Sequence, residues 1–187
     1  MKKVKIVGIA GSLRKDSFNR AILRTVKQVT PADIDFEILD LDEIPLYNQD
    51  VEAEMPEAVK VLKQKIKGAD AVLIATPEYD RSIPGVLKNA IDWASRPYGD
   101  NSFDDKAVAT VGASGGAIIG TAVAQYHLRQ IFSFLNAHPL ERPQVFIAGA
   151  ADKISEGVFA DEETRDLLKD LIQKLGEWAI RLEKGKQ

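Results

Sequence analysis

The chain has 187 residues, of which 45% are hydrophobic and 28% are charged, as expected for an ordinary globular protein with one domain. Its formal net charge of −3 argues against nucleic acid or an anionic membrane as the main partner, and no run of about 18 apolar residues could span a bilayer. Cysteine is absent and there are only two histidines, so we expect no disulfide, no thiolate chemistry and no metal site, in a cytoplasmic protein.

Apolar strands alternate with amphipathic helices along the chain. The strands are expected at residues 4–9, 34–41, 69–75, 107–111 and 144–147, and the helices at about 17–29, 59–68, 85–96, 116–136 and 162–182. Long surface loops are expected at 42–55, 98–105 and 148–158, and Tyr126 is placed on the inward face of the fourth helix. Strands that are apolar throughout and alternate with helices predict a parallel sheet covered on both faces.

Three of the loops that follow strands have an unusual composition. AGSLRKDSFN follows the first strand, TPEYDRSIPG the third and GASGGAIIG the fourth. In an open α/β sheet, ligands bind beyond the carboxyl ends of the strands, where the strand order reverses. If the order is 2-1-3-4-5, these three strands are neighbours and their loops converge on one site.

The first loop suits a phosphate group. The backbone N–H groups at the start of the following helix favour an anion. Ser12, Ser17 and Asn19 can add neutral donors, and Arg14 adds a planar charged fork. The loop is neither a P-loop nor the GxGxxG loop of dinucleotide-binding folds. The alternative interpretation is a serine-capped helix beside a solvated arginine.

The other two loops suit a planar ring. Pro77 and Pro84 stiffen the second loop, which can present backbone groups to a polar ring edge while Tyr79 offers an aromatic face. Glycines in the third loop let the backbone approach a ligand closely. The alternatives are a proline-rich turn with a core tyrosine and a tight strand-to-helix turn. A ligand with a phosphate at one end and a hydrogen-bonding aromatic ring at the other, such as FMN, would fill all three loops.

The segments GSLRKDSFN, PEYDRSIPGVLKNAIDW and GASGG followed by QYHLRQ resemble the NADPH-dependent FMN reductase family, over about residues 4–146. The resemblance implies an α/β, flavodoxin-like three-layer sandwich with a five-stranded parallel sheet of order 2-1-3-4-5. It also implies a homodimer or homotetramer, to which residues 42–51 and 90–98 contribute. By motif position, FMN would be bound by Gly11, Ser12, Arg14, Ser17, Phe18, Asn19, Pro77, Glu78, Tyr79, Asp80, Ser114, Gly115 and Gly116.

The resemblance further implies an oxidoreductase that uses FMN as cofactor and NADPH or NADH as co-substrate. Two electrons would pass to a small-molecule acceptor: a quinone, an azo compound, a flavin or a metal oxyanion such as chromate. The flavin carries this chemistry, so no catalytic residue is assigned, and His127 and His138 are expected to be structural or interfacial. A flavodoxin-type electron carrier without its own substrate is the alternative, and a structural protein with a vestigial flavin site is a second one.

Asp80 departs from the asparagine that usually follows PEY in this family. An ionised aspartate only accepts hydrogen bonds, whereas asparagine also donates them. If Asp80 faces the flavin ring, it would oppose the charge of the reduced flavin and lower its potential, and Arg81 could neutralise it. The alternative is an Asp80–Arg81 pair on the surface.

Overall fold

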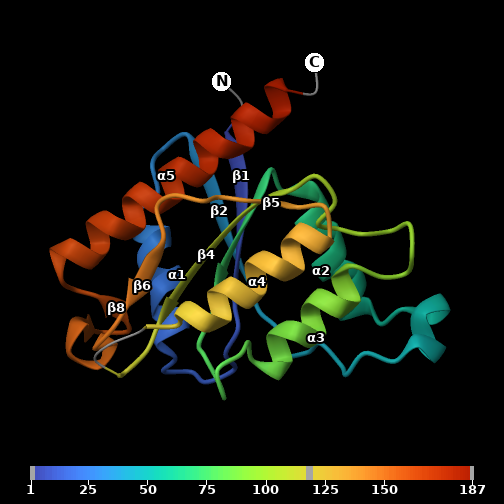
Figure 1. The fold of residues 1–187 in the computed structure, drawn as a ribbon, viewed down its shortest axis with the longest axis horizontal. Coiled ribbons are helices and arrows are strands. Elements are labelled where there is room, and N and C mark those ends of the chain that lie inside the picture. The colour runs from blue at the N-terminus through green and yellow to red at the C-terminus, as the bar shows by residue number, and fades with distance from the viewer. Residues whose placement is uncertain (1–2, 117–119, 186–187) are drawn as a thin grey trace.

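A parallel sheet forms the centre of the computed structural model, which describes residues 3–116 and 120–185 (Figure 1). Its strands run in the order β2-β1-β3-β4-β5, with β6 also paired to β4, and every pair in this sheet is parallel. The predicted fold class and strand order are therefore confirmed. The strands are β1 (Val4–Ala10), β2 (Ile34–Leu39), β3 (Ala71–Ala75), β4 (Ala107–Ala113), β5 (His138–Pro139) and β6 (Val145–Ile147).

Five helices cover the two faces of the sheet. One face packs against α1 (Phe18–Val29) and α5 (Glu162–Lys184), and the other against α2 (Glu57–Gly68), α3 (Gly85–Ala94) and α4 (Ala122–Phe134). Successive strand residues alternate between the faces, so Leu73 packs on the α1 side and Val72 on the α2 side. Because both faces are buried, all five residues of β3 had to be apolar.

Short elements occupy two of the predicted loops. A 3-10 helix, η1 (Gln49–Glu54), lies within residues 42–55. A second one, η2 (Ala150–Lys153), and the antiparallel hairpin of β7 (Ile154–Ser155) and β8 (Val158–Phe159) lie within residues 148–158. Both segments are therefore more ordered than loops, although neither adds a strand to the central sheet.

Two short strands pair with β4 at this edge of the sheet, and the sequence predicts only the second of them, at residues 144–147. β5 pairs with the start of β4 and β6 with its end, and residues 140–144 leave the sheet between them. Pro143 lies in this interruption and has no N–H to donate to a ladder. The sequence predicts β6 because Val145 and Ile147 are apolar, and both are buried in the structure. The two-residue strand β5 at His138 is too short to leave a pattern in the sequence.

The fourth helix begins later than predicted. Gly120 has φ +59° and Thr121 has non-helical angles, so α4 starts at Ala122, and residues 117–119 of the predicted helix lie outside the described residues. The inward placement of Tyr126 is also wrong, because Tyr126 is exposed and its neighbour Gln125 is buried. Gln125 accepts a hydrogen bond from Thr110 on β4 and donates one to the Val145 carbonyl, so a polar residue holds the inward position.

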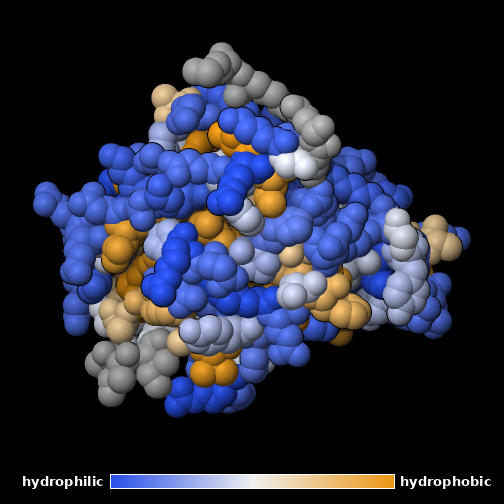
Figure 2. Space-filling model, turned by 45° about the horizontal axis from the view of Figure 1, so that its top comes forward, coloured by the Kyte–Doolittle hydropathy of each residue, from blue (hydrophilic) through white to orange (hydrophobic). Residues whose placement is uncertain are grey.

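The surface is mainly hydrophilic where the C-terminal end of α5 comes forward, with hydrophobic residues in small separate patches (Figure 2). Figure 1 places both chain ends on that side of the molecule, at the amino end of β1. Within residues 3–116 and 120–185, no helix is both long enough and apolar enough to cross a bilayer.

Of the glycines in the described chain, Gly112 leaves the least space for a side chain. A Cβ on this residue would lie 1.7 Å from Thr121 Oγ1 and 2.4 Å from the Thr76 carbonyl oxygen. Thr76 follows β3 and Thr121 precedes α4, so the bare backbone of β4 is what lets these two segments meet. The loops at the carboxyl edge of the sheet depend on this close approach.

Gly112→Ala should lower the free energy of unfolding by about 1–3 kcal/mol, the usual cost of overpacking a core. Urea unfolding followed by circular dichroism measures the change. Gly68→Ala, at the end of α2, is the matched control because no atom of the described residues lies within 4 Å of an added Cβ there. It should be neutral or stabilising by up to about 1 kcal/mol. Equal losses in both variants would contradict the tight contact at Gly112.

Candidate functional site

The three loops converge at the carboxyl edge of the sheet, as the sequence predicts. β1, β3 and β4 are adjacent, and the Gly11 N–H donates to the Ala75 carbonyl at 2.8 Å, which joins the first loop to the end of β3. A cavity of about 190 Å³ lies between the loops. It is lined by Ser12, Arg14, Ser17, Phe18, Asn19, Pro77, Glu78, Tyr79, Ala113, Ser114 and Gly115.

The first loop presents free backbone donors. Within the described chain, no protein group accepts a hydrogen bond from the N–H of Ser12, Leu13, Lys15 or Asp16. Arg14 is exposed and forms no ion pair with a described residue, and its guanidinium only reaches the Asp16 carbonyl at 3.5 Å. Unpaired N–H groups beside an unpaired guanidinium are the donor set of an anion site.

Ser17 is the N-cap of α1. Its Oγ accepts from the N–H groups of Asn19 at 3.2 Å and Arg20 at 3.4 Å, while Ser12 Oγ accepts from the Arg14 N–H at 3.4 Å. A serine hydroxyl that accepts still keeps its own proton to donate. The alternative of a serine-capped helix is therefore correct for Ser17, and it leaves the hydroxyl able to bind an anion as well.

Asn19 has a structural task that the sequence did not reveal. Its side-chain amide donates to the Ala113 carbonyl at 3.1 Å and accepts from the Ala113 N–H at 3.0 Å. This buried pair ties the start of α1 to the end of β4. Asn19 thus brings the first and third loops together, and only one of its amide protons is left for a ligand.

The second loop is a tight turn. Tyr79 and Ser82 exchange both backbone hydrogen bonds, at 3.0 and 2.9 Å, and the two residues between them have positive φ, 48° at Asp80 and 60° at Arg81. Two central residues with positive φ are typical of a type I′ turn, in which asparagine and aspartate are favoured because they tolerate the left-handed conformation. Asp80 therefore has a backbone role at the tip of the turn.

The charges of this turn are arranged differently from the expectation. Asp80 is exposed and does not line the cavity, and within the described chain it pairs with no cation. The Arg81 guanidinium instead lies 3.4 Å from Glu78 Oε1. The structure thus has no Asp80–Arg81 pair among its described ion pairs, and a ring-facing Asp80 stays a prediction without support from the cavity lining.

Glu78 and Ser82 fasten the turn to α4. Glu78 is 10% exposed, and its Oε2 accepts a hydrogen bond from the Ala124 N–H in the first turn of α4 at 3.1 Å. A carboxylate at that position caps the helix and complements its dipole. Ser82 Oγ lies 3.0 Å from His127 Nδ1, also on α4. The side chain of Glu78 is therefore used within the protein, and His127 contacts the turn through Ser82.

The start of the third loop is hydrogen-bonded to the end of β6 and the segment that follows it. The Ser114 N–H donates to the Ile147 carbonyl, and the Ser114 carbonyl accepts from the Ala150 N–H, both at 3.0 Å. Among the described residues, a Cβ on Gly115 would lie 3.5 Å from Phe18, which is ordinary contact, and one on Gly116 would meet nothing closer than 4.0 Å. The described part of the chain therefore does not itself require glycine at these two positions.

Ten of the predicted residues line the cavity, and Gly11, Asp80 and Gly116 do not. Gly11 lies behind the loop, where a Cβ would be 3.0 Å from Leu87. Ala113 lines the cavity without having been predicted, because an alanine at a strand end has no side-chain signal. Contact of any of these residues with FMN stays a prediction.

Residues 42–55 are held against α3. The Tyr47 N–H donates to Asn89 Oδ1 at 2.7 Å, and Trp93 Nε1 donates to the Pro45 carbonyl at 2.9 Å. Farther along, Glu52 accepts from Arg96 Nε at 2.7 Å. This bond to Arg96 holds the pKa of the Glu52 carboxyl below its usual value, and the Tyr47 hydroxyl, which also donates to Glu52, has a raised pKa.

This attachment leaves two large side chains in solvent. Leu46 is 85% exposed, and Tyr98 is 89% exposed with its ring 3.8 Å from the Arg96 guanidinium. Both lie in the segments, 42–51 and 90–98, at which the family resemblance leads us to expect a subunit interface. The exposed side chains of Leu46 and Tyr98 therefore extend from backbone whose neighbouring residues are hydrogen-bonded to one another.

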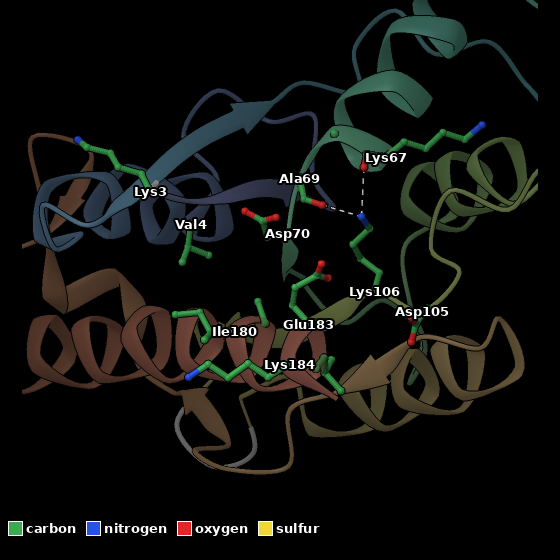
Figure 3. Close-up of a pocket in the computed structure, with 14 residues that line it drawn as sticks. Lys3, Val4, Lys67, Ala69, Asp70, Asp105, Lys106, Ile180, Glu183 and Lys184 are labelled. Atoms are coloured by element: carbon green, nitrogen blue, oxygen red, sulfur yellow. Dashed lines mark hydrogen bonds between the residues drawn. The ribbon is translucent and has the colours of Figure 1, made fainter. Parts of the chain in front are cut away.

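A larger cavity, of about 430 Å³, lies at the opposite edge of the sheet, beside the last turns of α5 (Figure 3). Lys106 lines this cavity, and its Nζ donates to the carbonyls of Lys67 at 3.2 Å and Ala69 at 2.6 Å. Asp70 accepts from the Lys5 N–H at 2.7 Å. Lys106 and Asp70 thus form hydrogen bonds with backbone groups. The cavity adjoins the amino ends of the strands, whereas ligands of open α/β sheets bind at the carboxyl ends.

Comparisons with known proteins agree on one family. A sequence model of the NADPH-dependent FMN reductases matches residues 4–152. The chain is 46% identical over 181 residues to an NAD(P)H-dependent FMN reductase of Pseudomonas aeruginosa, covering 96% of this chain and 97% of the relative. It is 42% identical over 176 residues to a 2-hydroxy-1,4-benzoquinone reductase of a Burkholderia species, covering 94% and 96%.

A solved structure is also similar over its whole length. The flavoenzyme NAD(P)H:(acceptor) oxidoreductase FerB of Paracoccus denitrificans superposes with a TM-score of 0.87 at 37% identity, covering 95% of this chain and 98% of that chain. The family match spans β1 to η2 and so includes all three loops of the cavity. This chain belongs to the NADPH-dependent FMN reductase family.

Proposed function

We propose that this chain binds FMN between its three loops and reduces a small-molecule acceptor with NAD(P)H. When bound, FMN supplies the redox chemistry, by taking up a hydride and giving up two electrons. The observation that carries the proposal is the donor set of the cavity: unpaired backbone N–H groups and Arg14 on one loop, facing a rigid turn on another.

The first loop would hold the phosphate. The Arg14 guanidinium supplies the charge, and the free N–H groups of the loop supply neutral donors. The hydroxyls of Ser12 and Ser17 accept from the backbone and can donate their own protons to the anion. This fits a phosphate monoester, which has acceptors only and carries a double negative charge.

The second loop would hold the ring. In the described chain the N–H and C=O of Glu78 have no protein partner, whereas its carboxylate is used by α4 and Arg81. The backbone of this loop therefore offers one donor and one acceptor, and Tyr79 offers a half-exposed ring. The turn between Tyr79 and Ser82 and its two attachments to α4 keep these groups in place without a ligand.

We propose a quinone as the acceptor class, since relatives that share 39–42% of their residues with this chain are named as quinone reductases. Azo compounds, flavins and chromate remain further expectations from the sequence. The electron-carrier alternative differs from this proposal in one respect, which is whether the chain accepts electrons from NAD(P)H directly.

We also propose that the chain works in the cytoplasm as a single-domain subunit of a homodimer or homotetramer. Support for the assembly comes from Leu46 and Tyr98, two large exposed side chains that lie in the segments expected at the interface. Absence of cysteine fits a reducing compartment.

Arg14→Gln should raise the dissociation constant for FMN about tenfold or more, because a charge-assisted hydrogen bond contributes about 1.5–3 kcal/mol. Its affinity for riboflavin, which lacks the phosphate, should stay within about twofold by the same reasoning. Titration of flavin fluorescence gives both constants. Lys15→Gln removes a neighbouring cation that does not line the cavity and is the control. A similar loss in both variants, or an equal loss for riboflavin, would contradict a phosphate site at Arg14.

When the FMN-loaded protein is mixed anaerobically with NADPH or NADH, the visible absorbance of the oxidised flavin should disappear promptly. Subsequent addition of a benzoquinone should restore the absorbance with one quinone consumed per flavin. Stopped-flow absorbance measures both phases. Bleaching that occurs only with dithionite, or only when a partner reductase is added, would identify an electron carrier instead.

Leu46→Glu should reduce the assembly to a smaller species, because it places a charge at the proposed interface. Light scattering after gel filtration measures the mass. Val61→Glu, at a 45% exposed position on α2 outside the predicted interface segments, is the control and should keep the wild-type mass. A chain that is monomeric before substitution, or a Leu46→Glu variant of unchanged mass, would rule out this interface.

A further inference from the structure

Arg20 connects the first loop to the strand beside it. It lies in the first turn of α1 and is 20% exposed. Its Nε donates to the Ser12 carbonyl at 3.1 Å, and its Nη2 lies 2.6 Å from Asp42 Oδ2 and 3.4 Å from Asp40 Oδ1. One guanidinium thus joins the loop, the helix that follows it and the segment after β2.

The bond to Ser12 fixes the direction of a peptide unit in the proposed phosphate loop. The C=O of Ser12 and the N–H of Leu13 belong to one planar trans peptide and point in opposite directions. Because Arg20 binds the oxygen, that peptide cannot turn its carbonyl toward the cavity, where it would repel an anion. The N–H of Leu13, from which no group in the described chain accepts a hydrogen bond, is thereby kept as a donor on the side opposite the Ser12 carbonyl.

The two aspartates hold the guanidinium in turn. Asp40 and Asp42 follow β2, whose neighbour in the sheet is β1, the strand that leads into the loop. In the rigid, planar guanidinium, Nε binds the carbonyl while Nη2, a separate nitrogen, faces the carboxylates. The single nitrogen of a lysine ammonium does not reproduce this separation of the donors. Arg20 does not line the cavity, so it acts through the loop and not on the ligand.

We propose that Arg20 is a positioning residue for the phosphate site, and that Asp42 is needed for it to act. This inference rests on the proposed function. A positioning role and a purely electrostatic one make opposite predictions for Asp42. If Arg20 served as a remote positive charge, removal of the Asp42 carboxylate would strengthen FMN binding. If Arg20 orders the loop, the same removal frees the guanidinium and weakens binding.

The binding experiment uses four variants and flavin fluorescence. Arg20→Gln should raise the FMN dissociation constant about threefold to tenfold, the range for ordering a loop on binding. Asp42→Asn should raise it in the same direction, and Arg20→Lys should not restore the wild-type value. Arg24→Gln is the matched control: Arg24 lies one turn later on α1, and its Nε donates to the Gly157 carbonyl at 2.7 Å, away from the cavity.

Trypsin provides a readout that needs no flavin. Arg14 and Lys15 are exposed cleavage sites within the loop, and cleavage of the unliganded protein follows the population of open loop. Arg20→Gln and Asp42→Asn should be cut at these two sites several times faster than wild type, and Arg24→Gln should not. Mass spectrometry of the N-terminal fragment identifies the site.

The outcomes separate the two proposals. Tighter FMN binding by Asp42→Asn, full rescue by Arg20→Lys, or a loss equal to that of Arg24→Gln would overturn the positioning role. If the wild-type chain binds no FMN, the proposed function fails, and the trypsin comparison alone then decides whether Arg20 orders the loop. Unchanged cleavage in Arg20→Gln would overturn the inference in that case too.

Discussion

The absence of a side chain at Gly112 is the constraint on which the carboxyl edge of the sheet depends. The Thr76 carbonyl and the Thr121 hydroxyl occupy the space that a Cβ would need. The loop after β3 can therefore lie directly against the segment that enters α4, and Glu78 can reach the Ala124 N–H. A bulkier residue would separate the two, and the turn would lose its attachment to the helix. The geometry of the proposed ring site thus depends on the absence of a Cβ at Gly112 in the neighbouring strand β4.

Most side chains around the cavity hold the protein together and leave binding to the backbone. Asn19 joins α1 to β4, Glu78 joins the turn to α4, and Ser17 caps α1. What they leave free is a set of N–H groups, one guanidinium and an aromatic ring. Because backbone groups keep their position in a packed frame, a site of this kind loses little entropy when a ligand binds. Side chains that a sequence motif assigns to the ligand can therefore serve to hold the loops together.

The strand order and the convergence of three loops could be predicted because they depend on patterns. β3 is a continuous apolar run, β1 and β4 are apolar apart from Lys5 and Thr110, and the residues after all three strands are unusual in composition. The two-residue strand β5, the start of α4 and the outward position of Tyr126 could not be predicted in this way. β5 is too short to leave a pattern, Gly120 delays the helix through its positive φ, and the buried pair between Thr110 and Gln125 occupies the inward position of α4. The last of these is a tertiary contact that overrides periodicity, whereas the first two are local.

The turn at Asp80 and Arg81 shows why a motif position need not keep its chemistry. Two consecutive residues with positive φ cost about 1–2 kcal/mol each when they are neither glycine nor asparagine-like, and Arg81 is such a residue. The contact between Arg81 and Glu78, the paired backbone hydrogen bonds of Tyr79 and Ser82, and the contact of Ser82 with His127 offset this cost. Aspartate satisfies the backbone at the first central position as well as asparagine does. The departure at Asp80 therefore changes the charge at the tip of the turn while the path of the chain beside the cavity is retained.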